Sequence, residues 1–129
     1  LHFDLQDNFE CDINRIGQLY SNLLGNAIKH GARNKPIKTE IVAQNGTFSL
    51  AVSNWGNKIP DAKKLDLFKP FFTTNATNNK SGLGLGLYIS SEIAKAHDGK
   101  MEVESTDDIT EFKFTMPIKT VSNDVHITE

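Results

Sequence analysis

A tight-turn signal at Asn45-Gly46 constrains the fold of this chain most strongly. It separates two strand-like segments, residues 37–44 (IKTEIVAQ) and residues 47–53 (TFSLAVS). Asn-Gly favours the two-residue turn that joins antiparallel strands. The second segment alternates apolar and polar residues, so we expect one of its faces to be buried; the apolar positions are Phe48, Leu50 and Val52.

A second hairpin is predicted near the end of the chain. Residues 100–106 (KMEVEST) and 109–116 (ITEFKFTM) alternate apolar and polar side chains on either side of Asp107-Asp108. Residues 1–5 (LHFDL) alternate as well and predict a further short strand. Because hairpins account for most of the pairing, the sheet should be mostly antiparallel.

Two helices are predicted from apolar residues that recur at three- and four-residue steps. The first runs from Asp12, which suits an N-cap, to His30, and Gly31 is expected to end it as the C′ residue. Gly17 and Gly25 lie inside it at a cost of about 1 kcal/mol each relative to Ala, so we expect another group to approach the backbone there. The apolar stripe is Ile13, Ile16, Tyr20, Leu23, Leu24 and Ala27.

The second helix follows a run of glycines and is predicted to end near Asp98-Gly99. Residues 61–67 (DAKKLDL) predict a short helix, and residues 73–81 (TTNATNNKS) predict a polar, mobile loop. No element is predicted for the tail, residues 118–129. The apolar stripe of the second helix is Leu85, Ile89, Ile93 and Ala96.

These elements fit a single domain spanning residues 1–129, and 129 residues is an ordinary length for one domain. Strands joined mainly by hairpins, together with two main helices, predict an α+β fold. We expect a two-layer α/β sandwich in which the helices cover one face of a mixed, mostly antiparallel sheet.

Composition excludes several classes of protein. A net charge of −2 is unlike that of proteins that neutralise nucleic-acid phosphates, and no apolar run approaches the roughly 18 residues of a membrane span. The single cysteine, Cys11, cannot form an internal disulfide, and one Cys with four His disfavours a structural zinc site. No secretory signal is visible. The chain begins at Leu1 rather than Met, so we expect a fragment of a larger protein.

The first helix also carries a polar stripe, formed by Gln18, Asn22, Asn26 and Lys29. Their spacing of three and four residues places them on one face of the helix. Amide oxygens suit Mg²⁺, which prefers oxygen ligands, and a lysine places a positive charge on a phosphate. The stripe is therefore a candidate site for a metal-bound phosphate, and the alternative is an ordinary solvated helix face.

Residues 81–87 (SGLGLGL) form a glycine run just before the second helix. Glycine lets the backbone approach a ligand, and a helix N-terminus offers free N–H groups to phosphate. The spacing matches neither the GxxxxGK loop nor the dinucleotide-binding G-x-G-x-x-G motif after an early strand. Phosphate binding and a flexible hinge both remain open interpretations.

Two further segments suit a ligand site. In residues 51–60 (AVSNWGNKIP) a buried strand leads into Asn54 and Gly56, where a polar side chain beside a glycine would read the edge of a flat ring. A simple strand-ending turn is the alternative. Residues 67–74 (LFKPFFTT) gather three phenylalanines before the polar loop, either for the core or as an aromatic anchor.

In this order the segments resemble the catalytic ATP-binding domain of sensor histidine kinases, within the gyrase–Hsp90–histidine kinase–MutL (GHKL) superfamily and its Bergerat fold. Residues 22–31 (NLLGNAIKHG) resemble the N-box, VSNWGNKIP the G1 box, FKPFFTT the F-box and residues 82–90 (GLGLGLYIS) the G2 box. The resemblance covers residues 5–117, and it implies an ATP lid at about residues 61–83.

The resemblance implies a role for each of these residues. Asn26 would coordinate Mg²⁺ between the phosphates of ATP, with Asn22 and Lys29 beside it as the other catalytic residues. His30 would lie near the adenine or ribose, and Asn54 would accept a hydrogen bond from the adenine amino group. The other nucleotide-binding positions would be Gly56, Ile59, Phe68, Lys80, Gly82, Leu83, Gly84, Leu85 and Gly86.

The chain departs from the family pattern in the G1 box and in the lid. Asn54 and Lys58 stand where the family commonly has an aspartate and a glycine, which predicts weaker nucleotide binding and less space at the ring. Asn75 stands where a lysine or arginine usually follows the Thr-Thr pair, so Lys80 is the candidate for a γ-phosphate contact.

The resemblance implies a protein histidine kinase that donates the γ-phosphate of ATP to a histidine on a separate dimerisation domain, for relay to a response regulator. Catalysis would consist mostly of positioning and charge stabilisation. The amide of Asn22, where hydrolysing relatives have Glu, is a poor general base and favours transfer to histidine. His97-Asp98 is rejected as the phosphoacceptor pair, so this chain alone should bind ATP without phosphorylating itself.

The implied partners are ATP with Mg²⁺, the dimerisation domain of the same protein, which would form the homodimer, and the receiver domain of a response regulator. The implied location is cytoplasmic, including the cytosolic part of a membrane-bound receptor, without contact of this domain with nucleic acid or membrane. Two alternatives are an anti-sigma-type serine kinase of the same fold and an interaction module that has lost nucleotide affinity.

Overall fold

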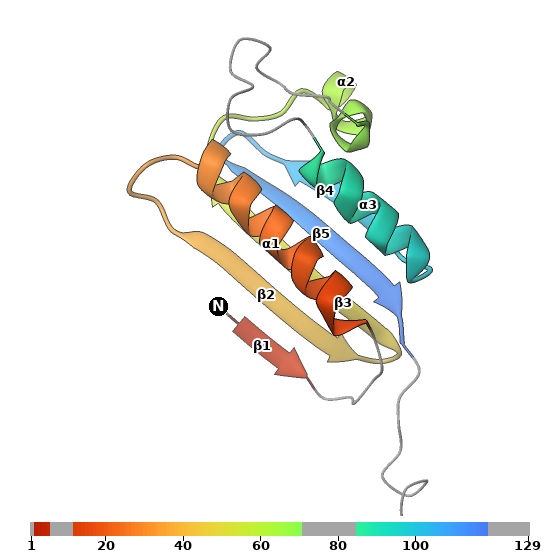
Figure 1. Ribbon diagram of the computed structural model, residues 1–129. Helices are drawn as coiled ribbons and strands as arrows, with labels where there is room; N and C mark the ends of the chain where they lie inside the picture. Colours follow the sequence, from red (N-terminus) through yellow and green to blue (C-terminus); the bar gives the residue numbers. More distant parts are fainter. Residues whose placement is uncertain (1, 6–11, 71–84, 119–129) are drawn as a thin grey trace, which may run out of the picture.

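The computed structural model describes residues 2–5, 12–70 and 85–118. Along the described part of the chain, one helix and then a group of three helical elements separate a first strand and two pairs of consecutive strands (Figure 1). Their bounds are β1 His2–Leu5, α1 Ile13–His30, β2 Ile37–Gln44, β3 Thr47–Trp55, α2 Asp61–Lys64, the 3-10 helix η1 Leu65–Phe68, α3 Gly86–Ala96, β4 Lys100–Ser105 and β5 Ile109–Pro117.

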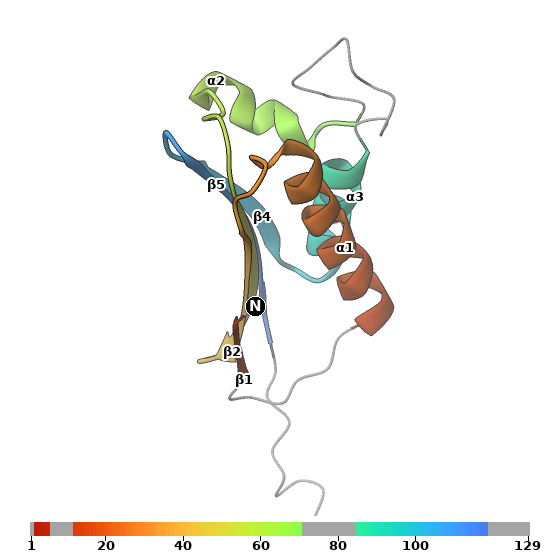
Figure 2. The ribbon, with the colours of Figure 1, turned by 90° about the vertical axis from the view of Figure 1, so that its left-hand side faces the viewer.

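The five strands form one sheet in the order β1-β2-β3-β5-β4. The pair β1–β2 is parallel, and the other three pairs are antiparallel. Helices α1 and α3 lie side by side on one face of the sheet in Figure 1, and Figure 2 shows the two layers edge-on. The predicted α+β sandwich with a mixed, mostly antiparallel sheet is confirmed.

Both predicted hairpins are present. Asn45 and Gly46 have φ values of 55° and 76°, the left-handed geometry that a tight two-residue turn requires of both central residues. The β4–β5 turn is closed by the amide of Thr106, which donates to the carbonyl oxygen of Ile109 at 2.8 Å. These local turn signals therefore fix the register of the β2–β3 and β4–β5 pairs.

The core lies between the helices and the sheet. On β3 the alternating residues Phe48, Leu50 and Val52 are all buried, as predicted. Phe48 meets Phe114 of β5 edge to face, with ring centroids 6.0 Å apart. Each such side chain contributes roughly 1.5–3 kcal/mol on burial. The buried residues of this cluster are Ile16, Leu19, Leu23, Ala27, Ala43, Phe48, Leu50, Val52, Leu67, Ile93, Ala94, Phe112, Phe114 and Met116.

The helix stripes differ in part from the prediction. Ile13 is 72% exposed, whereas Leu19, absent from the predicted stripe, is fully buried. Ile13 starts the first turn of α1, and the buried face of the helix begins only one turn later. In α3 the buried positions include Ser90 and Ala94, while Ala96 is exposed.

The glycines inside α1 lack the predicted close approach among the described residues, whereas Gly31 ends the helix as predicted. Within the part of the chain that the structure describes, no atom lies within 4 Å of the place where a Cβ would stand at Gly17 or Gly25. Gly31 follows α1 with an extended backbone, φ −72°, rather than a left-handed one. Glycine is nevertheless required there, because a Cβ would lie 2.5 Å from the carbonyl oxygen of Ala27.

The predicted short helix at residues 61–67 is present as α2 followed directly by η1. Residues 71–84, which hold most of the predicted polar loop and lid, lie outside the described residues, as does the tail after residue 118. Among the described helices, none has the length and apolar character needed to cross a membrane.

Candidate nucleotide site

The polar stripe of α1 faces the start of α3. The Asn22 side-chain amide donates from Nδ2 to the carbonyl oxygen of Gly86 at 3.3 Å and to Oγ of Ser90 at 3.4 Å. Asn22 and Gly86 are 64 residues apart in the sequence. The predicted N-box and the end of the predicted G2 box therefore meet at this point (Figure 1).

The other members of the stripe differ in exposure. Asn22 and Asn26 are half-buried, whereas Gln18 and Lys29 are exposed. The side-chain amides of Asn22 and Asn26 thus line the inner part of this face. The long side chain of Lys29 is able to reach a charged group at its rim. This is the arrangement that a metal-bound phosphate would need, with neutral oxygen ligands inside and a point charge outside.

Asn54 lies at the end of β3 and is 5% exposed. Its Nδ2 donates to the carbonyl oxygen of Trp55 at 3.1 Å. The same carbonyl accepts the amide of Ala32 at 2.6 Å, which holds the chain just after α1 against the end of β3. With Nδ2 engaged, the oxygen Oδ1 of Asn54 is the group suited to accept a hydrogen bond from a ligand.

Gly56 allows a close approach between the end of α1 and β3. A Cβ at this position would lie 3.1 Å from the carbonyl oxygen of His30 and 3.3 Å from Nδ2 of Asn54. A side chain there would therefore push on both predicted site residues. His30, Asn54 and Gly56 are brought together, as the sequence motifs predict.

The electrostatics at this end of α1 favour an uncharged imidazole. Partial burial lowers the pKa of His30, and the positive charge of the neighbouring Lys29 lowers it further. Both effects favour the neutral imidazole of His30, in which one nitrogen can accept a hydrogen bond and the other can donate one.

Three more predicted positions lie around the site. Phe68 packs edge to face against Phe112, with ring centroids 6.1 Å apart, so its main contact is with the core. Ile59 is half-buried against the same core, and Leu85 precedes α3 and is half-buried. Lys58 is exposed. The predicted positions Lys80, Gly82, Leu83 and Gly84, and also Phe71, Phe72 and Asn75, lie outside the described residues.

Sequence reasoning missed two buried hydroxyls next to Asn54. Thr110 is the cross-strand partner of Asn54, and Ser105 is the partner of Thr110. Both are buried on the helix-facing side of the sheet. Both residues could have been found from the sequence, because each is a polar residue at a position where the alternation of its strand predicts a buried apolar side chain.

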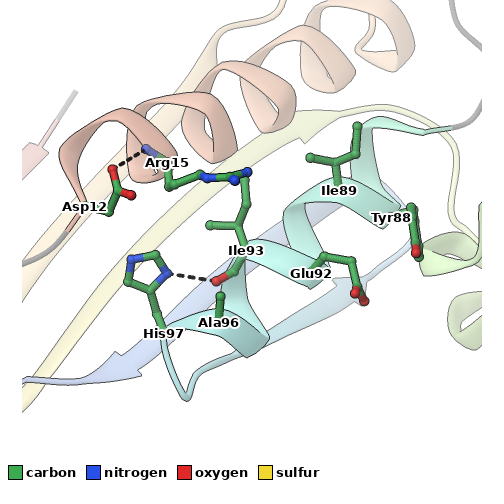
Figure 3. A pocket seen from close by; sticks show the side chains of 8 residues that line it. All are labelled: Asp12, Arg15, Tyr88, Ile89, Glu92, Ile93, Ala96 and His97. Atoms are coloured by element: carbon green, nitrogen blue, oxygen red, sulfur yellow. Dashed lines mark hydrogen bonds between the residues drawn. The ribbon is translucent and has the colours of Figure 1, made fainter.

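A pocket of about 610 Å³ lies elsewhere, between the first turns of α1 and the length of α3 (Figure 3). It contains none of the predicted site residues; Ile89, Ile93 and Ala96 belong to the predicted apolar stripe of the second helix. His97 lines it and its Nδ1 lies 2.9 Å from the carbonyl oxygen of Ile93. The lining residues are Asp12, Arg15, Tyr88, Ile89, Glu92, Ile93, Ala96 and His97.

Comparison with known proteins identifies the family. Residues 11–120 match the family HATPase_c, described as histidine kinase-, DNA gyrase B- and HSP90-like ATPases. A bacteriophytochrome of Pseudomonas aeruginosa is 37% identical over 118 residues, which are 90% of this chain and 16% of that protein. The heme sensor protein HssS of Staphylococcus haemolyticus is 39% identical over 103 residues, 79% of this chain and 22% of that protein.

A solved structure shows the same fold. The catalytic domain of histidine kinase ThkA, in a nucleotide-free form, superposes with a TM-score of 0.76 at 32% identity and covers 91% of this chain and 77% of that one. The chain spans less than a quarter of the length of the two curated relatives named above. The order of the motifs, the sandwich fold and these matches agree, so the chain belongs to the family of histidine kinase-, DNA gyrase B- and HSP90-like ATPases.

Proposed function

We propose that this chain is the ATP-binding catalytic domain of a sensor histidine kinase, which donates the γ-phosphate of ATP to a histidine on a separate dimerisation domain. The observation that carries the proposal is the meeting of Asn22 with Gly86 and Ser90. It joins the polar face of α1 to the start of α3, where a helix N-terminus offers N–H groups to phosphate. The similarity to sensor proteins and to the ThkA catalytic domain supports the same proposal.

In this proposal the adenine lies at the end of β3. Oδ1 of Asn54 accepts a hydrogen bond from the amino group of the base, while Nδ2 stays bonded to the Trp55 carbonyl. Gly56 leaves room for the ring, and neutral His30 borders it from the end of α1. An amide oxygen accepts a weaker hydrogen bond than a carboxylate does, so base binding is weaker than with aspartate.

The phosphates would lie along the polar stripe of α1, with Asn26 as the protein ligand of Mg²⁺ and Lys29 as a point charge on a phosphate. Among the described residues no group of three or more His, Cys, Asp and Glu side chains could hold a metal ion. The amide oxygen of Asn26 would suit Mg²⁺ held by one protein ligand together with phosphates and water. Bound there, the ion would supply positive charge that offsets the charge of the transferring phosphoryl group.

The remaining partners follow from the same proposal. The phosphoacceptor histidine belongs to the dimerisation domain of the full protein, and a response regulator then takes the phosphate. Histidine kinase ThkA has been solved in complex with the response regulator protein TrrA, and this chain matches that ThkA chain with a TM-score of 0.73 at 31% identity. A cytoplasmic location, where ATP is present, fits these partners.

The test combines a binding and a transfer experiment. Amide NMR with MgADP should shift the signals of Asn26, Asn54 and Gly86, and incubation with a cognate dimerisation domain and radiolabelled ATP should give acid-labile phosphate on that domain. If no NMR signal shifts at MgADP concentrations up to millimolar, the proposal is contradicted, and the chain is an interaction module that does not bind nucleotide. Acid-stable phosphate on a serine of a partner would indicate the serine kinase instead, and acid-labile phosphate on His97 would contradict the assignment of the acceptor to another domain.

A further inference from the structure

A row of polar side chains crosses the sheet at the base end of the candidate site. Asn54 of β3, Thr110 of β5 and Ser105 of β4 are direct cross-strand partners. All three are buried, with exposed fractions of 5%, 3% and 8%. In the next row on the same face, Val52 of β3 pairs with Phe112 of β5, which pairs with Val103 of β4, whereas Thr39 of β2 is polar and buried. On β3, β5 and β4 the polar row is therefore confined to this end of the sheet.

The hydroxyl of Ser105 connects this row to the segment that follows β3. It lies 2.8 Å from the hydroxyl of Thr110, and it accepts a hydrogen bond from the amide of Ile59 at 2.9 Å. Ile59 is half-buried against the core. The side chain of Ser105 thus fixes the far end of residues 56–60.

The near end of the same segment is fixed by the backbone. The amide of Gly56 donates to the carbonyl oxygen of Asp108 at 2.8 Å. Residues 56–60 are therefore attached at both ends to the β4–β5 hairpin, once through a backbone carbonyl and once through a side chain. Within the described residues every buried side-chain nitrogen or oxygen atom has a hydrogen-bond partner, and the Ser105 hydroxyl is a partner of both the Ile59 amide and the Thr110 hydroxyl.

We propose that Ser105 is a positioning residue for nucleotide binding, which holds Ile59 and residues 56–60 beside Asn54 so that the base-binding end is formed before ligand arrives. This inference rests on the proposed function. Ser105 acts through Ile59 and Thr110 and does not itself contact the ligand. Its loss leaves the Ile59 amide and the Thr110 hydroxyl without this partner, and the backbone of the segment then keeps its hydrogen bond to the β4–β5 hairpin at Gly56.

The test compares Ser105→Ala with Ser105→Thr and with Ser53→Ala. Ser53 is a matched control, because it lies next to Asn54 on β3 but bonds to Glu111 at 3.4 Å on the opposite face of the sheet. Ser105→Ala should weaken MgADP and adenosine binding by about tenfold each, the equivalent of one lost hydrogen bond. Binding of inorganic triphosphate with Mg²⁺ should stay unchanged. Ser105→Thr, which keeps the hydroxyl, should restore adenosine binding, and Ser53→Ala should match the wild type.

Hydrogen exchange provides the local readout. In Ser105→Ala the Ile59 amide should exchange faster, while the Gly56 amide keeps its protection. Unchanged adenosine affinity in Ser105→Ala would overturn the inference, and so would an equal loss for adenosine and triphosphate, which would indicate general destabilisation. Failure of the wild type to bind adenosine or ADP would overturn the proposed function as well, so the two failures are distinguishable.

Discussion

Replacement of Gly56 by Ala tests whether the end of α1 and the end of β3 form one site. The added Cβ would lie 3.1 Å from the carbonyl oxygen of His30 and 3.3 Å from Nδ2 of Asn54. Ordinary van der Waals contact needs roughly 3.5–4.0 Å, so both neighbours must move by several tenths of an ångström. Among the described residues Gly46 is the glycine with positive φ, so the effect at Gly56 is steric rather than conformational.

The two neighbours differ in how easily they move. The His30 carbonyl belongs to the last residue of α1, whose following chain is tied to β3 by the bond from Ala32 to Trp55. The Asn54 side chain is held by one bond at 3.1 Å and yields more readily. Introducing a methyl group into a packed place costs about 1–3 kcal/mol. We expect Gly56→Ala to lower the free energy of unfolding by about 1–2 kcal/mol, at the lower end of that range, and to displace the Asn54 amide.

Two measurements separate these effects. Urea unfolding should show the loss of stability, and calorimetry should show ADP affinity reduced by at least about tenfold, because the base acceptor has moved. Gly17→Ala is the control: it lies in the same helix as His30, no described residue outside the helix's own backbone has an atom within 4 Å of the new Cβ, and the variant should gain up to about 1 kcal/mol. A Gly56→Ala variant with wild-type stability and wild-type ADP affinity would refute the reasoning.

Three further predictions concern the metal ligand, the histidine and the core. Asn26→Ala should abolish most of the Mg²⁺ dependence of ADP binding in calorimetry, and an unchanged dependence would contradict its role as ligand. Because the pKa of His30 is lowered in the folded state, the unfolded state binds more protons at pH values between the folded-state pKa and 6.5. The free energy of unfolding should therefore rise with pH through this window and reach its full value above it. His30→Gln should flatten that slope in urea unfolding at pH 5.5 to 7.5 (chosen about one unit either side of the ordinary value), and an unaltered slope would assign it to another group. Phe114→Ala, at a fully buried position, should cost about 3–5 kcal/mol, and a loss below about 1 kcal/mol would mean that the core is loosely packed there.

Local signals predicted the β2–β3 and β4–β5 hairpins correctly, whereas the antiparallel pairing of β3 with β5 joins segments far apart in the sequence. Asn45-Gly46 has the positive φ values that its turn demands, and the alternation of Phe48 and Leu50 marks the buried face of β3. These features depend on residues that are neighbours in sequence. The parallel pairing of β1 with β2 depends on a contact across the whole of α1, and no turn signal specifies it.

The helix stripes show where periodicity stops being sufficient. Ile13 fits the spacing of the α1 stripe yet is exposed, because the packed part of the helix starts one turn further along. In α3 the small residues Ser90 and Ala94 are buried. Asn22 lies 3.4 Å from the Ser90 hydroxyl, so a small polar residue suits the contact between the helices better than a large apolar one. Spacing alone carries no information about the distance to a second helix.

The candidate site was predicted from the order of its motifs, and its two halves are held differently. At the base end, Gly56 and Ile59 are fixed to the β4–β5 hairpin by bonds of 2.8 and 2.9 Å. At the phosphate end, Asn22 links α1 to α3 by bonds of 3.3 and 3.4 Å from a half-buried amide. Longer hydrogen bonds are weaker, so the contact between the helices is the softer part of the site. A ligand that engages both ends would therefore meet a sheet edge held by two short hydrogen bonds and a helix pair joined by longer ones.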